Sequence, residues 1–438
     1  MIDVATLAQR LFDTRDGELV VGGVPVGEVA ETTGTPAFVY DSSVITGSVQ
    51  RLREALPSPF DLYYSIKANP NQAILGLVLE QGCGLEVASA GEFYQALKSG
   101  CPPDRILFAG PGKSVEELDY VVDAGIGEIH VESIREIDAL AAVATRRGRR
   151  VGVAVRVNPG EGALGGAMRM GGQPSQFGID EEALEPAIDR VLSHTSLQLL
   201  GIHLFAGTQI LDHETLVRQY RNGLEIAQKV VKRTGSPLRT IDFGGGLGIP
   251  YYAGDNPLDV ESLGHGVTEL VSAIGTGPEF QGTRFIVEPG RFVVGEAGIY
   301  LCRVIDIKVS RNKTYVIVDG GMNHHLAASG NLGQVIKRNF PVGVLNKLDR
   351  RPATKVDVVG PLCTPLDVLA RAVELPEIEV GDLVGVFQSG AYARAASPLG
   401  FLSHPAPPEA LVLGGDLHIV RRRGSFESLV ADQLAPEI

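Results

Sequence analysis

A lysine at the end of an apolar, strand-like run is the clearest candidate for chemistry in this sequence. Lys67 ends the run LYYSIK and is followed by Ala68 and Asn69. Partial burial of a lysine at a strand end favours the uncharged amine, which a Schiff base with a carbonyl compound requires. From this segment alone, an ordinary surface lysine at a strand end is an equally good interpretation.

Two other segments contain residue types that bind phosphate. DFGGGLGIPYY contains Gly244, Gly245 and Gly246, which let backbone N–H groups approach an anion closely. EPGR supplies Glu288, which could pair with a ring nitrogen, and Arg291, whose forked guanidinium suits a phosphate. A tight turn and a structural salt bridge are the respective alternatives. The glycine run does not match G-x-G-x-x-G, which argues against a nicotinamide site.

A cysteine in a turn-rich loop is the candidate thiol. Cys363 lies in GPLCTPLD, where the turn-forming neighbours disfavour a position in a core strand. The four cysteines of the chain have neither metal-ligand spacing nor the density of a disulfide framework. We therefore expect no bound metal, and a reduced, cytoplasmic protein.

The bulk composition excludes several classes of protein. A formal net charge of −13 argues against nucleic-acid binding, which needs clustered Lys and Arg. We expect no membrane span, because no apolar run reaches about 18 residues. With 438 residues, 44% of them hydrophobic, the chain is expected to form two well-packed domains.

Eight short β-rich runs alternate with helical segments over the first two thirds of the chain. The runs are LYYSIKA (62–68), GLEVAS (84–89), ILFAG (106–110), EIHVES (128–133), GVAVRVNP (152–159), GIHLFAG (201–207), TIDFGGG (240–246) and RFIVEPG (284–290). Eight buried strands alternating with helices predict an α/β fold, a (β/α)₈ TIM-like barrel. Nearly every run ends in polar or glycine residues, and the active sites of such barrels lie at the C-terminal ends of the strands.

After residue 291 the pattern changes to strand-like runs separated by turns, which predicts a mostly antiparallel β domain. We expect the barrel to span residues 37–290 and the β domain to span 291–438. The N-terminal segment, 1–36, is expected to join the β domain.

The segments SIKANPN, GLEVASAGEF, DFGGGLGIPY, EPGRF, GPLCTPLD and SGAY, in this order, resemble the fold-type III pyridoxal phosphate (PLP) decarboxylases. That family includes diaminopimelate, ornithine and arginine decarboxylases, and the resemblance covers about residues 36–430. It implies an alanine racemase-like architecture and a head-to-tail homodimer with shared active sites.

The resemblance also implies roles for individual residues. Lys67 would carry PLP, Glu288 would hydrogen-bond the pyridine nitrogen, and Cys363 of the partner subunit would protonate the substrate carbon after CO₂ leaves. The positions matching the phosphate site are Thr208, Gly244, Gly245, Gly246, Arg291 and Tyr392, and those matching the surroundings of the ring are Glu86, Glu92 and Arg156.

Two departures from the family pattern bear on the substrate. The histidine that the family places against the PLP ring corresponds to Phe205, not to His203. The acidic residue that follows the cysteine in diamine-specific members is replaced by Thr364, with Asp367 as the nearest substitute. Together with VDGGMNHH and SPLGFLSHP, these departures resemble a narrower branch, which includes the butirosin-pathway decarboxylase that acts on a glutamyl group attached to a carrier protein.

The function implied is decarboxylation of an L-amino acid or an amino-acid-derived substrate, either a free small molecule or one presented on an acyl carrier protein. The alternative is a diaminopimelate or ornithine/lysine-type decarboxylase. An amino acid racemase of the same fold would pair the ring nitrogen with arginine, so Glu288 and Cys363 disfavour it. A non-catalytic regulator would be expected to lose Lys67 or the phosphate loop.

Overall fold

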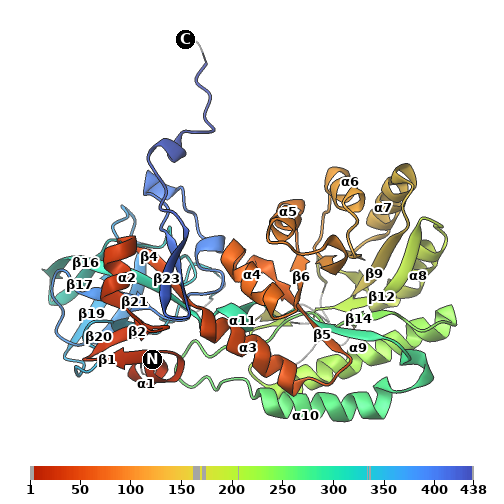
Figure 1. The fold of residues 1–438 in the computed structure, drawn as a ribbon, viewed down its shortest axis with the longest axis horizontal. Coiled ribbons are helices and arrows are strands. Elements are labelled where there is room, and N and C mark those ends of the chain that lie inside the picture. The colour runs from red at the N-terminus through yellow and green to blue at the C-terminus, as the bar shows by residue number, and fades with distance from the viewer. Residues whose placement is uncertain are drawn as a thin grey trace. The chain divides into compact units, whose positions relative to one another are not determined.

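The computed structural model describes residues 4–160, 168–169, 174–205, 207–332, 334 and 337–436. The chain divides into two compact units (Figure 1). The sheet unit comprises residues 1–46, 251–255 and 294–438, and the barrel unit comprises residues 47–250 and 256–293.

Parallel strands close into a barrel in the barrel unit. The pairing order runs β9–β12–β14–β15–β5–β6–β7–β8, and β8 also pairs with β9, which closes the ring. The barrel strands are β5 (Phe60–Ser65), β6 (Gly84–Val87), β7 (Ile106–Phe108), β8 (Glu128–Val131), β9 (Val151–Asn158), β12 (Leu197–Leu204), β14 (Thr240–Asp242) and β15 (Arg284–Val287). The predicted (β/α)₈ barrel is confirmed, and each of the eight β-rich runs overlaps one of its strands.

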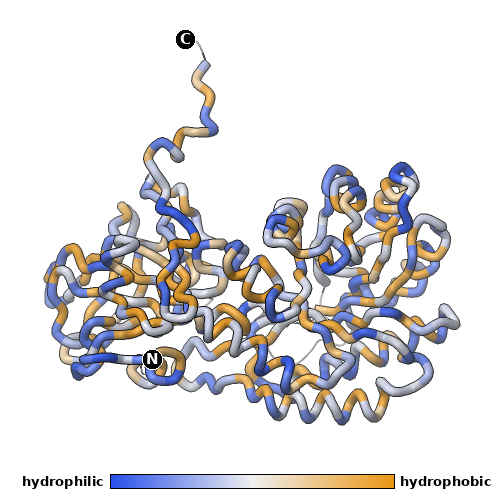
Figure 2. The backbone as a smooth tube through the Cα atoms, in the orientation of Figure 1, coloured by the Kyte–Doolittle hydropathy of each residue, from blue (hydrophilic) through white to orange (hydrophobic). Residues whose placement is uncertain are grey.

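Helices follow the barrel strands because amphipathic segments lie between them. These helices are α4 (Gln72–Glu80), α5 (Ala90–Lys98), α6 (Val115–Asp123), α7 (Ile134–Arg147), α8 (Leu184–Leu192), α9 (His213–Thr234) and α10 (Val260–Leu270). Figure 2 shows apolar and polar residues alternating along α9 and α10. Ser89 and Ser133, which follow strands, cap α5 and α7 by accepting backbone N–H bonds. Some polar residues at strand ends therefore start helices.

A nine-stranded sheet with mostly antiparallel pairings dominates the sheet unit. Its strands are β4 (Ala37–Asp41), β16 (Gly298–Ser310), β17 (Lys313–Val318), β18 (Val342–Val344), β19 (Thr354–Val359), β20 (Val368–Leu375), β21 (Leu383–Val386), β22 (Glu409–Leu413) and β23 (Asp416–Arg421). Only the β17–β19 and β4–β22 pairs are parallel among these described strands. The predicted mostly antiparallel second domain is confirmed. Residues 37–41, which we expected at the start of the barrel region, instead form a strand of this sheet.

The N-terminal segment contributes to the core of the sheet unit. It forms α1 (Val4–Leu11), β1 (Asp13–Arg15), β2 (Glu18–Val21), β3 (Val24–Pro25) and α2 (Val26–Thr33), and α3 (Ser42–Ala55) follows β4. Leu19 and Val21 of β2 belong to one buried cluster with Val39 of β4 and Leu301 of β16. Among the described residues, no helix has both the length and the apolar character that crossing a bilayer requires.

Candidate active site

Lys67 lies just beyond the C-terminal end of β5, in a single helical turn (Ile66–Ala68). Its Nζ is 2.6 Å from Oε2 of Glu86, a buried residue of β6. Ser65 also donates to this oxygen. The Lys67 side chain is 43% exposed, so its amine is held by a buried carboxylate yet can be reached from outside.

Glu92 is near this pair but already has a structural partner. Its Oε2 accepts the backbone N–H of Ala88 at 2.6 Å, at the start of α5. Burial raises the pKa of Glu92, and the negative Glu86 adds to the effect while Lys67 opposes it. Glu92 therefore interacts electrostatically with Lys67 and Glu86, and its hydrogen bond with Ala88 also orders the turn before α5.

Arg156 of β9 is fixed by an ion pair with Glu132, which lies in the strand-like run EIHVES. Its Nη1 lies 2.7 Å from Oε1 of Glu132, and the guanidinium carbon lies 5.0 Å and 6.0 Å from the ring centres of Phe177 and Phe205. Burial alone would raise the pKa of Glu132, but Arg156 outweighs it and the pKa is lowered. This ion pair fixes the Arg156 guanidinium within reach of two aromatic rings.

The three glycines after β14 form a tight turn that has no room for side chains. A Cβ at Gly244 would lie 2.4 Å from the Leu204 carbonyl, and one at Gly245 would lie 2.5 Å from the Glu288 carbonyl. Gly244 and Gly246 have φ values of +69° and +100°, which glycine adopts readily. The turn can therefore bring bare backbone close to an anion.

The other predicted phosphate residues of the barrel unit lie on separate elements. Thr208 is half-buried in β13 (Gly207–Thr208), which pairs with β10 (Met168–Arg169). Arg291 is the first residue of α11 (Arg291–Val294).

Glu288 follows β15 and is 4% exposed. Its Oε1 has no hydrogen-bond partner among the described residues, and its Oε2 lies 3.6 Å from Nε2 of His203. His203 is buried, whereas Phe205 is only half-buried, at the end of β12. Burial lowers the pKa of His203 to about 4, so this imidazole is neutral at physiological pH.

These residues fit PLP. The barrel unit provides a reachable amine at Lys67, a glycine turn suited to a phosphate, and a buried carboxylate oxygen of Glu288 that lacks a donor. A protonated pyridine nitrogen is the donor that such an oxygen requires.

The remaining predicted residues lie in the sheet unit. Cys363 is exposed and Thr364 is half-buried, in the loop between β19 and β20. Asp367, in the same loop, is 3% exposed, and its two carboxylate oxygens accept the backbone N–H groups of Met322 at 2.7 Å and Leu362 at 2.8 Å. Tyr392 follows β21 and has a φ of +54°.

A family described as pyridoxal-dependent decarboxylase, pyridoxal binding domain, matches residues 43–295. The chain belongs to the pyridoxal-dependent decarboxylases. It is 37% identical over 406 residues to the L-glutamyl-[BtrI acyl-carrier protein] decarboxylase of Niallia circulans, covering 92% of this chain and 94% of the relative. It is 31% identical over 393 residues to the 2-[(L-alanin-3-ylcarbamoyl)methyl]-2-hydroxybutanedioate decarboxylase of Staphylococcus aureus, covering 87% and 96%.

The solved structures agree with this assignment. The crystal structure of diaminopimelate decarboxylase from M. jannaschii has a TM-score of 0.89 and 27% identity, over 98% of this chain and 99% of that chain. The protein is therefore a PLP-dependent amino acid decarboxylase with the predicted cofactor.

The sequence analysis assigned no role to His130 and Asp242, which lie inside the barrel of this decarboxylase beside His203 and Glu288. His130, His203, Asp242 and Glu288 are buried, and their potential ligand atoms lie within 4.8 Å of one another. For His130 the sequence does contain a signal. Polar residues alternate in its strand run, where Glu128, His130 and Glu132 occupy every second position. Polar residues on the inward face of a barrel strand are uncommon enough to be noticed.

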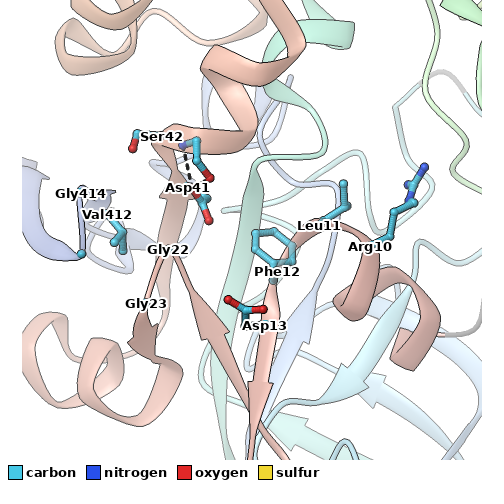
Figure 3. Close-up of a pocket in the computed structure, with 12 residues that line it drawn as sticks. Arg10, Leu11, Phe12, Asp13, Gly22, Gly23, Asp41, Ser42, Val412 and Gly414 are labelled. Atoms are coloured by element: carbon cyan, nitrogen blue, oxygen red, sulfur yellow. Dashed lines mark hydrogen bonds between the residues drawn. The ribbon is translucent and has the colours of Figure 1, made fainter. Parts of the chain in front are cut away.

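A hollow of about 530 Å³ in the sheet unit contains none of the predicted site residues. Figure 3 shows Arg10, Phe12, Asp13 and Asp41 around it. The carboxylate of Asp41 accepts the backbone N–H of Ser43 at 2.8 Å and so is used at the start of α3.

Replacing Asp367 by Asn is expected to destabilise the decarboxylase. An amide offers one acceptor where the loop needs two, so one buried N–H would face an NH₂ group, at a cost of about 1–3 kcal/mol. Urea unfolding of the Asp367→Asn and wild-type proteins measures the difference. An equal free energy of unfolding would show that the two buried hydrogen bonds contribute nothing.

Proposed function

We propose that the enzyme decarboxylates an amino acid whose distal group is uncharged or acylated, such as a glutamyl group held by a carrier protein. This proposal rests on the absence of an available carboxylate at Thr364 and Asp367, in the loop after Cys363. Thr364 is neutral, and both oxygens of Asp367 are occupied by backbone N–H groups. Neither side chain offers a free carboxylate to a distal ammonium group.

The absence of a free carboxylate should strongly disfavour substrates with a charged distal amine. A buried ammonium without its carboxylate partner costs about 3–5 kcal/mol, which is about two to four orders of magnitude in efficiency. A masked distal group avoids this cost. The name of the Niallia circulans relative gives a glutamyl group on a carrier protein, and that of the Staphylococcus aureus relative gives an alanine linked through C3 to an amide. Both names support a substrate without a free distal amine.

In this proposal, the residues at the barrel end bind and orient the reacting group. Lys67 would bind the cofactor covalently, Glu288 would hydrogen-bond its ring nitrogen, and Arg156, Glu86 and Glu92 would lie around the ring. When bound, PLP supplies the electron sink that accepts the electrons of the Cα–carboxylate bond. Phe205 would take the place of the histidine that the family has beside the ring, and it has no proton to donate. The residues that would bind the phosphate are Thr208, Gly244, Gly245, Gly246, Arg291 and Tyr392.

We further propose a homodimer with shared sites. Cys363 of one subunit would deliver a proton to the substrate carbon at the Lys67 site of the other subunit. The exposed position of Cys363 in its loop supports this assignment, since a thiol that acts on another subunit must be reachable.

Steady-state kinetics on a substrate panel with CO₂ detection tests the masked-substrate proposal. The panel contains free ornithine, lysine, diaminopimelate, arginine and glutamate, together with a glutamyl carrier protein. We expect kcat/KM for the carrier-bound substrate to exceed that for the free diamino acids by about 10²–10⁴-fold.

Thr364→Asp is the matched variant, because it restores the acidic residue at the position after the cysteine. It should narrow that gap by raising turnover of free diamino acids. Efficient turnover of free diaminopimelate by the wild type would refute the proposal and favour the activity named for the M. jannaschii structure.

A further inference from the structure

A buried polar cluster inside the barrel contains more unpartnered atoms than the proposed mechanism uses. The barrel cluster consists of His130, His203, Asp242 and Glu288, each at most 4% exposed. Both ring nitrogens of each histidine, Oδ2 of Asp242 and Oε1 of Glu288 have no hydrogen-bond partner among the described residues. Buried polar atoms are nearly always satisfied, so the cluster must hold a donor that heavy-atom positions alone do not reveal.

We propose that Asp242 is a positioning residue that carries a proton on Oδ2 and donates it to Glu288, so that Glu288 alone is ionised. Two adjacent, fully buried carboxylates repel each other strongly when both are charged. A single proton between them removes the repulsion. It also gives an acceptor to Oδ2 of Asp242, which otherwise has no partner among the described residues.

The neighbours of Glu288 favour its ionised form. His203 Nε2 lies 3.6 Å from Glu288 Oε2, and the Lys67 ammonium group also acts on this carboxylate. Burial alone would raise the pKa of Glu288, but these neighbours hold it below its usual range. His203 itself is kept neutral by burial, and the nearby Arg156 adds to this effect. The electrostatic surroundings of Glu288 thus favour its charged form.

The neighbours of Asp242 favour its neutral form. Burial and the negative Glu288 raise the pKa of Asp242 well above its usual value, and Glu128 adds to the effect. The nearest ring nitrogen, Nε2 of His130, is 4.0 Å from Asp242 Oδ2 but 3.3 Å from Glu128 Oε1. His130 is therefore better placed to donate to Glu128 than to stabilise a charge on Asp242.

Asp242 also connects the two parts of the proposed cofactor site. Its Oδ1 accepts the backbone N–H of Gly244 at 2.7 Å, and the Gly244 carbonyl accepts the Glu288 N–H at 2.8 Å. One side chain thereby fixes both the glycine turn and the Glu288 carboxylate. This consequence for the cofactor rests on the proposed function, whereas the position of the proton does not.

A divalent cation on the same four side chains is the competing explanation. It would place positive charge beside the carboxylate that is to keep the pyridine nitrogen protonated, and so would favour loss of that proton. The electrostatics of a PLP enzyme therefore favour a shared proton over a metal ion at this position.

Thermal unfolding of the holoenzyme between pH 5 and 8.5, with PLP in excess, tests the proposal on wild type, Asp242→Asn and Glu288→Gln. Asparagine has the shape of the neutral acid and keeps the acceptor for Gly244. A carboxyl whose pKa is raised by folding stabilises fully below its unfolded pKa, and this stability is lost as pH rises. The Tm of Asp242→Asn should therefore rise relative to that of wild type by about 1.5 °C per pH unit.

Glu288→Gln is the matched control, for which no pH trend is expected in this range. A carboxyl whose pKa is lowered by folding contributes its full stability above its unfolded pKa of about 4.3, and this stability is lost only as pH falls below that value. The Tm difference between Glu288→Gln and wild type should therefore stay nearly constant between pH 5 and 8.5. The substrate panel has no bearing on these melting curves, so the two proposals can fail separately.

Three outcomes would overturn the assignment of the proton to Asp242. The first is an Asp242→Asn protein that does not fold. The second is a Tm difference between Asp242→Asn and wild type that stays constant over this pH range. The third is one equivalent of metal, found by elemental analysis, that the wild type holds and Asp242→Asn lacks.

Discussion

Replacing Lys67 by Ala is expected to abolish turnover, with a loss of at least about 10³-fold in kcat. Lys67 is the amine that the structure places at a barrel strand end, beside the buried Glu86. Without it, PLP can bind only through non-covalent contacts, so the visible absorption of the covalently bound cofactor should disappear. Borohydride reduction followed by peptide mapping should place the pyridoxyl group on the wild-type peptide that contains Lys67.

Lys98→Ala is the matched control, since Lys98 is an exposed lysine on α5 in the same unit. Its absorption spectrum and labelling should equal those of the wild type. A pyridoxyl label on any lysine other than Lys67 would contradict the assignment of the site.

Mixing Lys67→Ala with Cys363→Ala protein is expected to restore activity from two inactive parents. If each site takes Lys67 from one subunit and Cys363 from the other, a hybrid dimer has one site with both residues and one site with neither. Random exchange of equal amounts makes half of the dimers hybrids, so activity should reach about one quarter of the wild-type value. Each parent alone should remain about 10²-fold or more below wild type.

The reciprocal mixture separates shared sites from sites within one subunit. Hybrids between wild type and the double variant Lys67→Ala/Cys363→Ala contain no complete shared site, so exchange should lower activity. If sites lay within single subunits, activity would be unchanged by that exchange. Mass spectrometry of the mixtures must show that subunits exchange. Mixtures of the single variants that exchange but stay inactive would refute the shared-site arrangement.

The sequence determined those parts of the protein whose signal is local. Strand-like runs separated by amphipathic helices predicted the barrel, because hydrophobic period and length distinguish the two element types within a short window. Lys67, the glycine turn and Glu288 could be found because each follows such a run directly. The neutral Thr364 was equally visible, since its meaning depends only on its position after Cys363.

Tertiary structure decided how these residues are paired. The ion pair between Arg156 and Glu132 joins two strands, and Glu132 had appeared only as a polar strand end. Asp367 was a candidate for binding a distal ammonium, but its oxygens accept N–H groups from Met322, 45 residues away, and from its own loop. Whether a carboxylate is free or occupied depends on backbone groups that only folding brings to it.

The barrel cluster is another case in which the sequence could not predict which residues lie together. His130 and Glu288 are 158 positions apart, yet their potential ligand atoms lie within 4.8 Å. Strand pairing is a second example of a feature that the sequence alone did not predict. β4 directly precedes the barrel region in the sequence, yet it pairs with β16 and β22 of the sheet unit. The sequence alone determined the elements and the reactive residue types. Only the closed barrel decided which ionisable side chains are buried together, because burial and proximity arise from contacts between distant segments.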